Sequence, residues 1–425
     1  MLPMLLFAAP DGTVLEHPRL LALARSGEEI VAPPETPIPL PPTARLVHLP
    51  GRRPIGLDPE TGQAQLVDEV RIGRRRLVPD AVAAIFPPGY TRTFLPAAQR
   101  RGGPVLTQWA YAAAGWADGG PVGWALRTDR RTHWDPRRFS TPQLEQRIER
   151  RLAESPRNRV LRQLARCARE YRCFTAQNVF YARDEGALPA STGCNARCVG
   201  CISQARQGGP PSSMERIREA PLSDELAEVG GSHLSRATGR VMVSFGQGCE
   251  GEPLTRFKVI AAAVEAMRQK THRGSVNINT NASRPAALEA LFDAGLDALR
   301  VSLNSAHPEL YAAYYKPVGY SFSDVECSLA LARRRRVYLA LNLLILPGVT
   351  DREGEVELLS ELVVRHRVDQ VQARSLCIDA DQYAEVARGR GALGAPIGVR
   401  AMLLRLRRAA PWLSIGNFAR ALGER

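Results

Sequence analysis

The chain has 425 residues, of which 44% are hydrophobic and 24% are charged, a composition that excludes a disordered protein and predicts a globular one. This length exceeds what one core usually serves, so two or three domains are expected. The net charge of +14 comes almost wholly from arginine, since only three lysines occur, and its even scatter disfavours a dedicated nucleic-acid surface without excluding it. The longest apolar run, residues 338–347, is far below the roughly 20 residues of a membrane helix. With no signal-peptide pattern at the start of the sequence, we expect a cytoplasmic protein without membrane segments.

Residues 1–139 predict a β-rich N-terminal domain. Its first ten residues are apolar and run into Asp11-Gly12, which is typical of a strand followed by a turn. Farther along, residues 109–116 and 122–127 flank a glycine-rich turn and predict a β-hairpin. We expect the tryptophans of this region to fill its core, with a recognition surface as the alternative. They are Trp109, Trp116, Trp124 and Trp134.

Residues 140–186 predict a basic helical connector. Apolar residues recur at helical spacing after Ser140 and Thr141, either of which can cap a helix. A break near Pro156 separates this helix from a second one, expected over residues 158–171.

From residue 187 to residue 425, strand and helix patterns alternate. The strands are expected at residues 188–191, 241–245, 276–280, 298–303, 337–346 and 370–375. Helical stretches lie between them, at residues 254–268, 285–294, 324–334 and 353–365. Such alternation builds a parallel sheet with right-handed crossovers, and six units are too few to close a barrel. We therefore predict an α/β fold, an incomplete (β/α)6 TIM-like barrel.

Three of the eight cysteines lie close together, directly after the first expected barrel strand. A secreted disulfide framework is not expected in so large a chain without a signal peptide. Cys194, Cys198 and Cys201 form a C-x3-C-x2-C triplet, whose thiolates can hold three corners of a [4Fe-4S] cluster. Full protein ligation takes one more cysteine, so one iron would stay open for a ligand. A zinc site completed by a distant Cys or His is the alternative, although no second half-site is evident.

Polar and glycine-rich segments follow the next strands, at the edge where barrel enzymes place their chemistry. Residues 246–253 form a glycine-rich turn that allows close backbone approach and carries carboxylates suited to a cation. Asn277, Asn279 and Asn281 alternate along the third strand and so face one side. Buried amides need partners, which favours a polar ligand inside the barrel over amides that satisfy one another.

With these motifs in this order, residues 187–417 resemble the radical S-adenosylmethionine (radical SAM) superfamily. The resemblance implies that the three cysteines bind a [4Fe-4S] cluster, whose open iron is chelated by S-adenosylmethionine. The glycine-rich turn resembles the family's GGEP motif, which contacts the methionine ammonium. The residues that correspond are Glu250, Gly251 and Glu252, and Glu250 replaces the first glycine.

Two further segments are similar to the family's nucleoside contacts. Ser302 and Asn304 end the fourth strand like the ribose-contacting segment, and with Asn279 and Asn281 they are the expected polar contacts of S-adenosylmethionine. Residues 344–351 resemble the G-x-I-x-G-x-x-E element that lies along the adenine. There Gly348 matches and Leu346 replaces the isoleucine, whereas Gly200 departs from the aromatic residue that many members carry before the third cysteine.

Three other residues are candidates for contact with the substrate. Arg374, on the sixth strand with Asp379 and Asp381 just beyond, is the expected substrate contact, with a structural salt bridge as the alternative. Cys249 and Cys377 lie near the expected barrel mouth, where a thiol could quench a substrate radical or accept a group. The alternative for each is a small apolar filler.

The resemblance implies a radical reaction. A one-electron donor of the flavodoxin or ferredoxin type reduces the cluster, and S-adenosylmethionine is cleaved to methionine and a 5′-deoxyadenosyl radical that abstracts hydrogen from a substrate. We expect a small-molecule or peptide substrate. One alternative is an RNA-modifying enzyme of the same family, and the other is a non-catalytic iron–sulfur or zinc protein that has kept the fold.

Overall fold

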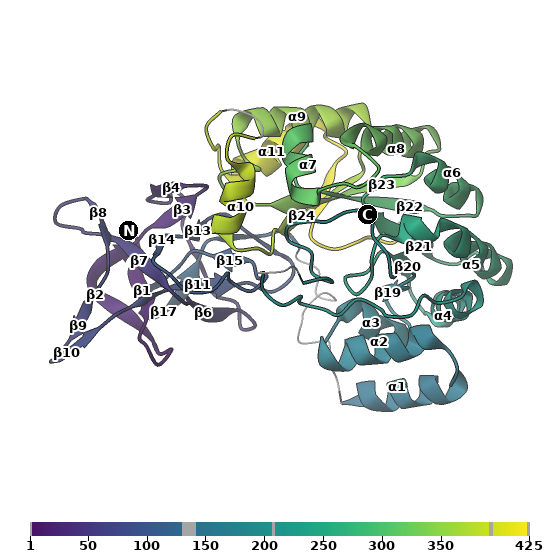
Figure 1. Ribbon diagram of the computed structural model, residues 1–425, viewed down its shortest axis with the longest axis horizontal. Helices are drawn as coiled ribbons and strands as arrows, with labels where there is room; N and C mark the ends of the chain where they lie inside the picture. Colours follow the sequence, from purple (N-terminus) through teal and green to yellow (C-terminus); the bar gives the residue numbers. More distant parts are fainter. Residues whose placement is uncertain (1, 130–141, 206–208, 391–393, 423–425) are drawn as a thin grey trace.

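The computed structural model describes residues 2–129, 142–205, 209–390 and 394–422. Figure 1 shows the N-terminal strands beside a curved parallel sheet that carries helices on its outer face. The prediction of a β-rich N-terminal region followed by an incomplete TIM-like barrel is confirmed. No helix in the described part of the chain is long and apolar enough to cross a membrane.

The N-terminal strands form one large antiparallel sheet and three small ones. The strands are β1 (Met4–Ala8), β2 (Val14–Ala22), β3 (Ala24–Ser26), β4 (Glu29–Val31), β5 (Ile38–Pro39), β6 (Arg45–Leu49), β7 (Arg52–Leu57), β8 (Ala64–Leu66), β9 (Val70–Ile72), β10 (Arg75–Leu77), β11 (Asp80–Ile85), β12 (Tyr90–Arg92), β13 (Leu95–Pro96), β14 (Ala98–Arg100), β15 (Tyr111–Ala112), β16 (Ala114–Ala117), β17 (Gly120–Gly123) and β18 (Ala125–Arg127). As expected, β1 ends in a turn, where Gly12 has a φ of 85°. The expected hairpin exists as β16 and β17, but β15 pairs with β11 and β18 pairs with β12.

The tryptophans of the N-terminal region do not share one role. Trp124 is buried, and its indole Nε1 donates to the carbonyl oxygen of Glu35 at 2.8 Å. Trp116 is half-buried, whereas Trp109 is 47% exposed. Trp134 lies outside the described residues. The expectation of a tryptophan-filled core is therefore met by Trp124 and is wrong for Trp109.

Three helices follow the N-terminal strands: α1 (Gln143–Glu154), α2 (Arg159–Glu170) and α3 (Phe174–Tyr181). The break between α1 and α2 is where the proline predicts it, and Asn158 caps α2 by accepting from the backbone N of Leu161 at 3.0 Å. The expected caps of the first helix, Ser140 and Thr141, lie outside the described residues. The sequence did not indicate α3, which packs against the first barrel strand.

Seven parallel strands form the barrel sheet, in the order of the chain. They are β19 (Glu185–Ala187), β20 (Met242–Phe245), β21 (Ser275–Thr280), β22 (Ala298–Leu303), β23 (Tyr338–Ile345), β24 (Gln370–Ser375) and β25 (Ser414–Gly416). The helices are α4 (Ser223–Arg236), α5 (Phe257–Lys270), α6 (Pro285–Asp293), α7 (Pro308–Tyr315), α8 (Phe322–Arg334), α9 (Glu353–Arg365), α10 (Ala380–Ala387) and α11 (Val399–Ala409), with a 3-10 turn at Pro253–Arg256. Their apolar faces and the strands share one continuous core.

The barrel differs from its prediction at both ends. The first strand was expected at residues 188–191 but lies at β19, because the backbone N–H groups of Ala190 and Ser191 donate to the Glu250 carboxylate instead of to a neighbouring strand. The seventh strand, β25, was not expected, since three residues carry too short a pattern.

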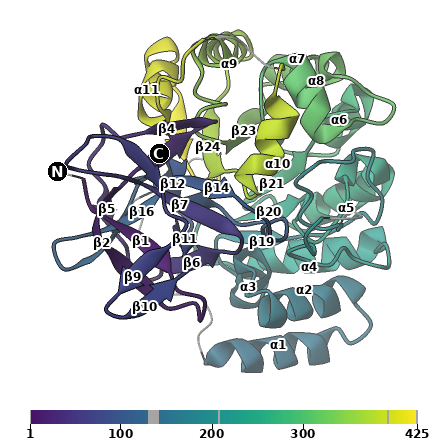
Figure 2. The ribbon, with the colours of Figure 1, turned by 60° about the vertical axis from the view of Figure 1, so that its left-hand side comes forward.

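The N-terminal region lies against the carboxyl ends of β23 and β24, and Figure 2 brings it to the front. The Thr91 hydroxyl donates to the carbonyl oxygen of Ala373 at 2.6 Å. Arg92, fully buried, donates to the carbonyl oxygen of Leu376 at 2.7 Å. A buried ion pair joins Arg52 to Asp379. This region therefore covers one side of the barrel mouth.

Candidate functional site

The three clustered cysteines lie on a loop after β19, which we call the cysteine loop (residues 191–203). Backbone hydrogen bonds hold it to the end of α7, from the N–H of Arg197 to Tyr315 and from the N–H of Val199 to Tyr314, both at 2.9 Å. The N-terminal region also reaches it, because Gln108 Nε2 donates to the carbonyl oxygen of Cys201 at 3.0 Å. All eight cysteines are free.

The cysteine loop forms one wall of a cavity of about 490 Å³ at the carboxyl ends of the barrel strands, called the main cavity below. Cys194, Cys198 and Cys201 all line it. In the described part of the chain, no group of three or more His, Cys, Asp and Glu side chains is arranged to hold a single metal ion. Arg216 reaches the same wall, with its Nη2 at 3.8 Å from Cys201 Sγ.

The glycine-rich turn (residues 246–253) is fastened to the cysteine loop by its backbone. Gly251 N donates to the Ser191 carbonyl, and Glu252 N to the Gly193 carbonyl, both at 2.8 Å. The approach is so close that a Cβ on Gly251 would lie 1.9 Å from the Gly193 oxygen. A glycine is therefore required where the two loops cross.

The two carboxyl groups of this turn have different surroundings. Glu250 lines the main cavity and accepts four backbone N–H bonds of 2.7–2.9 Å, including those of Ala190 and Ser191. Burial raises the pKa of Glu250 to about 7, although these amides act to lower it. Glu252 does not line the cavity and accepts from Asn281 N at 2.9 Å and from the Thr280 hydroxyl. Of the two, Glu250 is therefore the carboxyl that a ligand in the main cavity can meet.

The amides of β21 largely satisfy one another, which is the alternative that the sequence left open. Asn277 Nδ2 donates to Ser244 Oγ and to Asn279 Oδ1, each at 3.0 Å. Asn279 lines the main cavity, and its Nδ2 donates to the Gly246 carbonyl at 3.0 Å. Asn281 is buried and donates to Asn195 Oδ1 at 2.8 Å, so it braces the cysteine loop.

The remaining expected nucleoside contacts do not share one cavity. Ser302 lines the main cavity, whereas Asn304 is buried and donates to the Tyr383 hydroxyl at 3.0 Å. Leu346 and Gly348 line a different cavity of about 270 Å³ that the N-terminal region helps to form. At the main cavity, Tyr314 occupies the space beside Gly200, since a Cβ there would lie 2.8 Å from the tyrosine hydroxyl.

Two of the three expected substrate contacts line the main cavity. Arg374 and Cys377 are both in its wall, and the Cys377 thiol lies 3.6 Å from the Ser375 carbonyl oxygen. Burial raises the pKa of Cys377 despite the nearby guanidinium groups, which favours the neutral thiol. Cys249 is buried outside this wall, and its contact with the Cys167 thiol and its burial raise its pKa well above the usual range.

The acidic residues beyond β24 serve a structural purpose. Asp379 pairs with Arg52, and Asp381 pairs with Arg25 at 2.6 Å. Both ion pairs join the barrel to the N-terminal region, so the salt-bridge alternative holds for these two acids.

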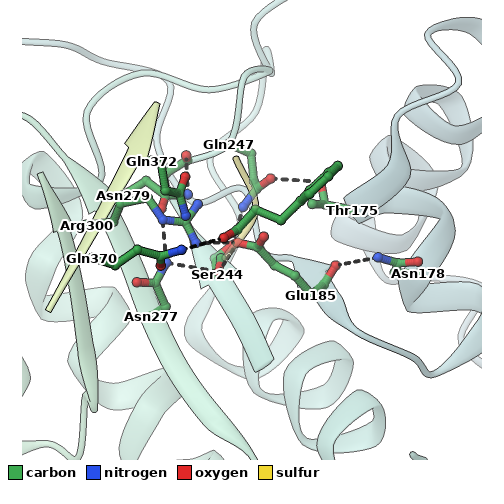
Figure 3. Close-up of polar contacts among 12 residues, drawn as sticks. Thr175, Asn178, Glu185, Ser244, Gln247, Asn277, Asn279, Arg300, Gln370 and Gln372 are labelled. Carbon is green, nitrogen blue, oxygen red and sulfur yellow. Dashed lines mark hydrogen bonds and ion pairs between the residues drawn. The ribbon is translucent and has the colours of Figure 1, made fainter. Parts of the chain in front are cut away.

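A polar group inside the barrel was missed by the sequence analysis. Glu185 of β19 and Arg300 of β22 form a buried ion pair of 3.0 Å, and Ser244 Oγ donates to the same carboxylate. Figure 3 shows these side chains, with Gln372 of β24, pointing toward one another across the sheet. Arg300 stands two residues before Ser302, so alternation along the strand was the signal that could have found it.

One family model matches the sequence of this chain. The sequence model of the family described as the Radical SAM superfamily matches residues 188–359. No curated protein matches the chain by sequence. Among solved structures, Streptococcus suis SuiB bound to precursor peptide SuiA is similar at 12% identity and a TM-score of 0.35, over 53% of this chain and 49% of that one.

Two other solved structures are similar at the same level. A radical SAM methyltransferase from Sphaerobacter thermophilus has 13% identity and a TM-score of 0.34, over 49% of this chain and 64% of that one. A cysteine-to-serine mutant of spore photoproduct lyase has 13% identity and a TM-score of 0.37, over 62% of this chain and 95% of that one. The chain thus spans about half the length of SuiB and less than two thirds of the methyltransferase.

Proposed function

Because residues 188–359 place this chain in the radical SAM superfamily, we propose that it is a radical enzyme acting on a small-molecule or peptide substrate inside the half-barrel. The family implies a [4Fe-4S] cluster and S-adenosylmethionine. The observation that carries the proposal is that all three cysteines of the triplet line one cavity together with the glycine-rich turn. We assign the barrel, residues 187–425, as the catalytic domain, with residues 1–139 as a second domain and residues 140–186 as the connector.

The residues present fit the cluster. Cys194, Cys198 and Cys201 would hold three irons from a single loop, and the Arg216 guanidinium beside Cys201 Sγ offsets the charge of a thiolate. When bound, the cluster and S-adenosylmethionine supply a one-electron cleavage that yields a 5′-deoxyadenosyl radical able to abstract hydrogen from a substrate.

The chain's own residues orient the ligand and exclude water. Glu250, held by four backbone amides, presents a preorganised carboxyl to the methionine ammonium, while Gly251 lets the turn approach the cysteine loop. Asn279 and Ser302 offer polar groups to the ribose from neighbouring strands. Tyr314 covers the wall at Gly200 with an aromatic ring, which we propose takes the place of the aromatic residue missing from the cysteine loop.

Five of the residues expected to contact S-adenosylmethionine do not line the main cavity: Glu252, Asn281, Asn304, Leu346 and Gly348. We propose that they shape the site by holding its loops, because each lies outside the wall of the main cavity. Cys249 is proposed for the same supporting role, whereas Cys377 and Arg374 face the cavity and are proposed to meet the substrate.

The proposed partners follow from the chemistry. An external one-electron donor of the flavodoxin or ferredoxin type is required to reduce the cluster. Eight cysteines without a disulfide bond suit a reducing compartment, so we propose a cytoplasmic location. Five arginines line a groove at α2, but three of them pair with glutamates, and an RNA substrate is therefore not proposed.

The test is anaerobic purification, reconstitution with iron and sulfide, and assay of 5′-deoxyadenosine after addition of S-adenosylmethionine and dithionite. We expect 5′-deoxyadenosine, and its loss when Cys194, Cys198 and Cys201 are replaced by alanine. Cys327→Ala, at an exposed thiol on α8, is the matched control and should change nothing. Bound zinc without iron, or product formation that survives the triple replacement, would overturn the proposal.

A further inference from the structure

Two arginines line the inner part of the main cavity, away from the cysteine loop. Arg300 comes from β22 and Arg374 from β24, two strands apart in the sheet. Burial and the proximity of Arg300 lower the pKa of Arg374 to about 10, so Arg374 stays charged at neutral pH. Two like charges held inside a barrel repel each other and favour an anion between or beside them.

Few carboxylates balance these charges. Glu185 pairs with Arg300 at 3.0 Å, and although burial opposes it, Arg300 holds the pKa of Glu185 below its usual value. Arg374 forms no ion pair with any described residue. Asp129 attracts it from farther away, but that carboxylate is occupied by backbone N–H groups, including one of Phe418 at 3.1 Å.

A third buried arginine lies behind the cavity wall. Arg92 is close to Cys377 without lining the cavity itself, and it donates only to backbone carbonyls, those of Tyr111 and Leu376. It has no carboxylate partner among the residues that the structure describes. Among the side chains that line this part of the cavity, Arg300 and Arg374 face one carboxylate, that of Glu185, which leaves one positive charge in excess.

The hydrogen-bonding capacity of Arg374 is also mostly unused. Its Nη1 donates to Asn417 Oδ1 at 3.0 Å. Its Nη2 lies 3.5 Å from Gln372 Oε1, at the outer limit of a hydrogen bond. The Gln372 amide is better satisfied with its oxygen turned to Arg300 Nε at 3.2 Å and Ala419 N at 3.1 Å, and this orientation removes the acceptor from Arg374. One edge of the guanidinium is therefore free to bind an oxyanion through two parallel bonds.

An independent observation marks the same place as a ligand site. Asn342 of β23 lines the main cavity in register between Ser302 and Gln372. Its Oδ1 is buried and has no hydrogen-bond partner. A buried amide oxygen without a partner is rare, and a polar ligand beside the arginines would satisfy it.

We propose that the main cavity binds its substrate through a carboxylate held by Arg374, with Arg300 and Asn342 beside it, so the substrate is a carboxylic acid. This inference rests on the proposed radical function and names the substrate class of that same site. A single carboxylate matches the single excess charge, whereas a phosphate dianion would exceed it. The carboxylate belongs to the substrate and not to S-adenosylmethionine, whose own carboxylate is expected at the open iron.

The probe is hippurate (N-benzoylglycine), compared with its neutral isostere hippuramide. Binding of each to the reconstituted protein loaded with S-adenosylmethionine is measured by calorimetry under anaerobic conditions. We expect the acid to bind at least tenfold more tightly than the amide. Arg374→Gln should remove this preference, Arg374→Lys should retain part of it, and Arg334→Gln, which removes an exposed charge on α8, should not alter it.

Three results would overturn the inference. They are equal binding of acid and amide by the unaltered protein, an acid preference that survives Arg374→Gln, and tighter binding of phenyl phosphate than of hippurate. The effect of S-adenosylmethionine on the electron paramagnetic resonance signal of the reduced cluster separates the two proposals. If Arg374→Gln abolishes that effect, the arginine serves S-adenosylmethionine and the inference fails. If the unaltered protein shows no such effect, the proposed function fails.

Discussion

Replacing Gly251 by alanine tests whether the glycine-rich turn and the cysteine loop act as one unit. The new Cβ would lie 1.9 Å from the Gly193 carbonyl oxygen, where ordinary contacts begin near 3.4 Å, so the loops must part by about 1.5 Å. Such a shift breaks the two backbone hydrogen bonds that join them, at Gly251 N and Glu252 N. Lost hydrogen bonds and overpacking together lower the free energy of unfolding by roughly 2–5 kcal/mol.

The same displacement moves the proposed S-adenosylmethionine contacts relative to the cluster, and misplacement by about 1 Å can reduce a rate about 100-fold. Two assays check this: 5′-deoxyadenosine formation and the denaturation midpoint, both under anaerobic conditions. Gly231→Ala is the matched control, because its Cβ meets Lys270 at 3.7 Å, an ordinary contact, within helix α4. That control should keep its activity and gain up to about 1 kcal/mol of stability. If Gly251→Ala matched it in both assays, the coupling of the two loops would be refuted.

Three further changes address the contacts around the barrel. Gly348 has a φ of 83°, and a Cβ there would lie 1.7 Å from Gly27 N, so Gly348→Ala should push the segment around Gly27 away from the barrel. Amide hydrogen exchange over residues 24–31 should therefore become faster, and unchanged exchange would contradict this. Asp379→Ala leaves the buried Arg52 without its partner and should cost about 3–5 kcal/mol in chemical denaturation, whereas a fall below 1 kcal/mol would show that the ion pair is dispensable. Burial raises the pKa of Glu355 to about 7 from 4.5, so the folded state prefers the protonated form and loses up to about 3 kcal/mol as pH rises through this range. Glu355→Gln should lack that loss, so its melting temperature should rise relative to that of the unaltered protein as the pH is increased from 5 to 8. If the melting temperatures of the two proteins ran parallel over this pH range, the burial of a charged Glu355 would not be the cause.

The barrel was predictable from sequence because its strands and helices are long enough to show their periods. β22, β24 and α9 lie where they were expected, residue for residue. β25 was missed because three residues are too few to show a period. β19 lies earlier than predicted because the backbone N–H groups of Ala190 and Ser191, which follow this strand, donate to the Glu250 carboxylate. The first cause lies within the segment itself, whereas the second comes from a residue about 60 positions later in the chain.

The prediction that site residues lie together was most accurate for residues on one loop or at the carboxyl ends of the strands. Arg374 and the cysteine triplet line one cavity because both lie at the carboxyl ends of parallel barrel strands. The positions of Leu346 and Gly348 depend on Gly27 of the N-terminal region, more than 300 residues earlier, and no local pattern can show that contact. Arg300 was overlooked because an arginine inside a strand reads as an exposed residue until its carboxylate partner is known.

The contact between β12 and β24 has a consequence for biosynthesis. Arg92 donates to the carbonyl of Leu376, which is 284 residues later in the chain. At a translation rate of about 5–20 residues per second, this partner leaves the ribosome roughly 15–60 s after Arg92 does. For that interval the docking face of the N-terminal strands must remain in water. Its polar side chains, Thr91, Arg92 and Arg52, keep this face hydrated and disfavour association with other chains before the barrel has folded. The same side chains lose their water when the completed barrel docks on them.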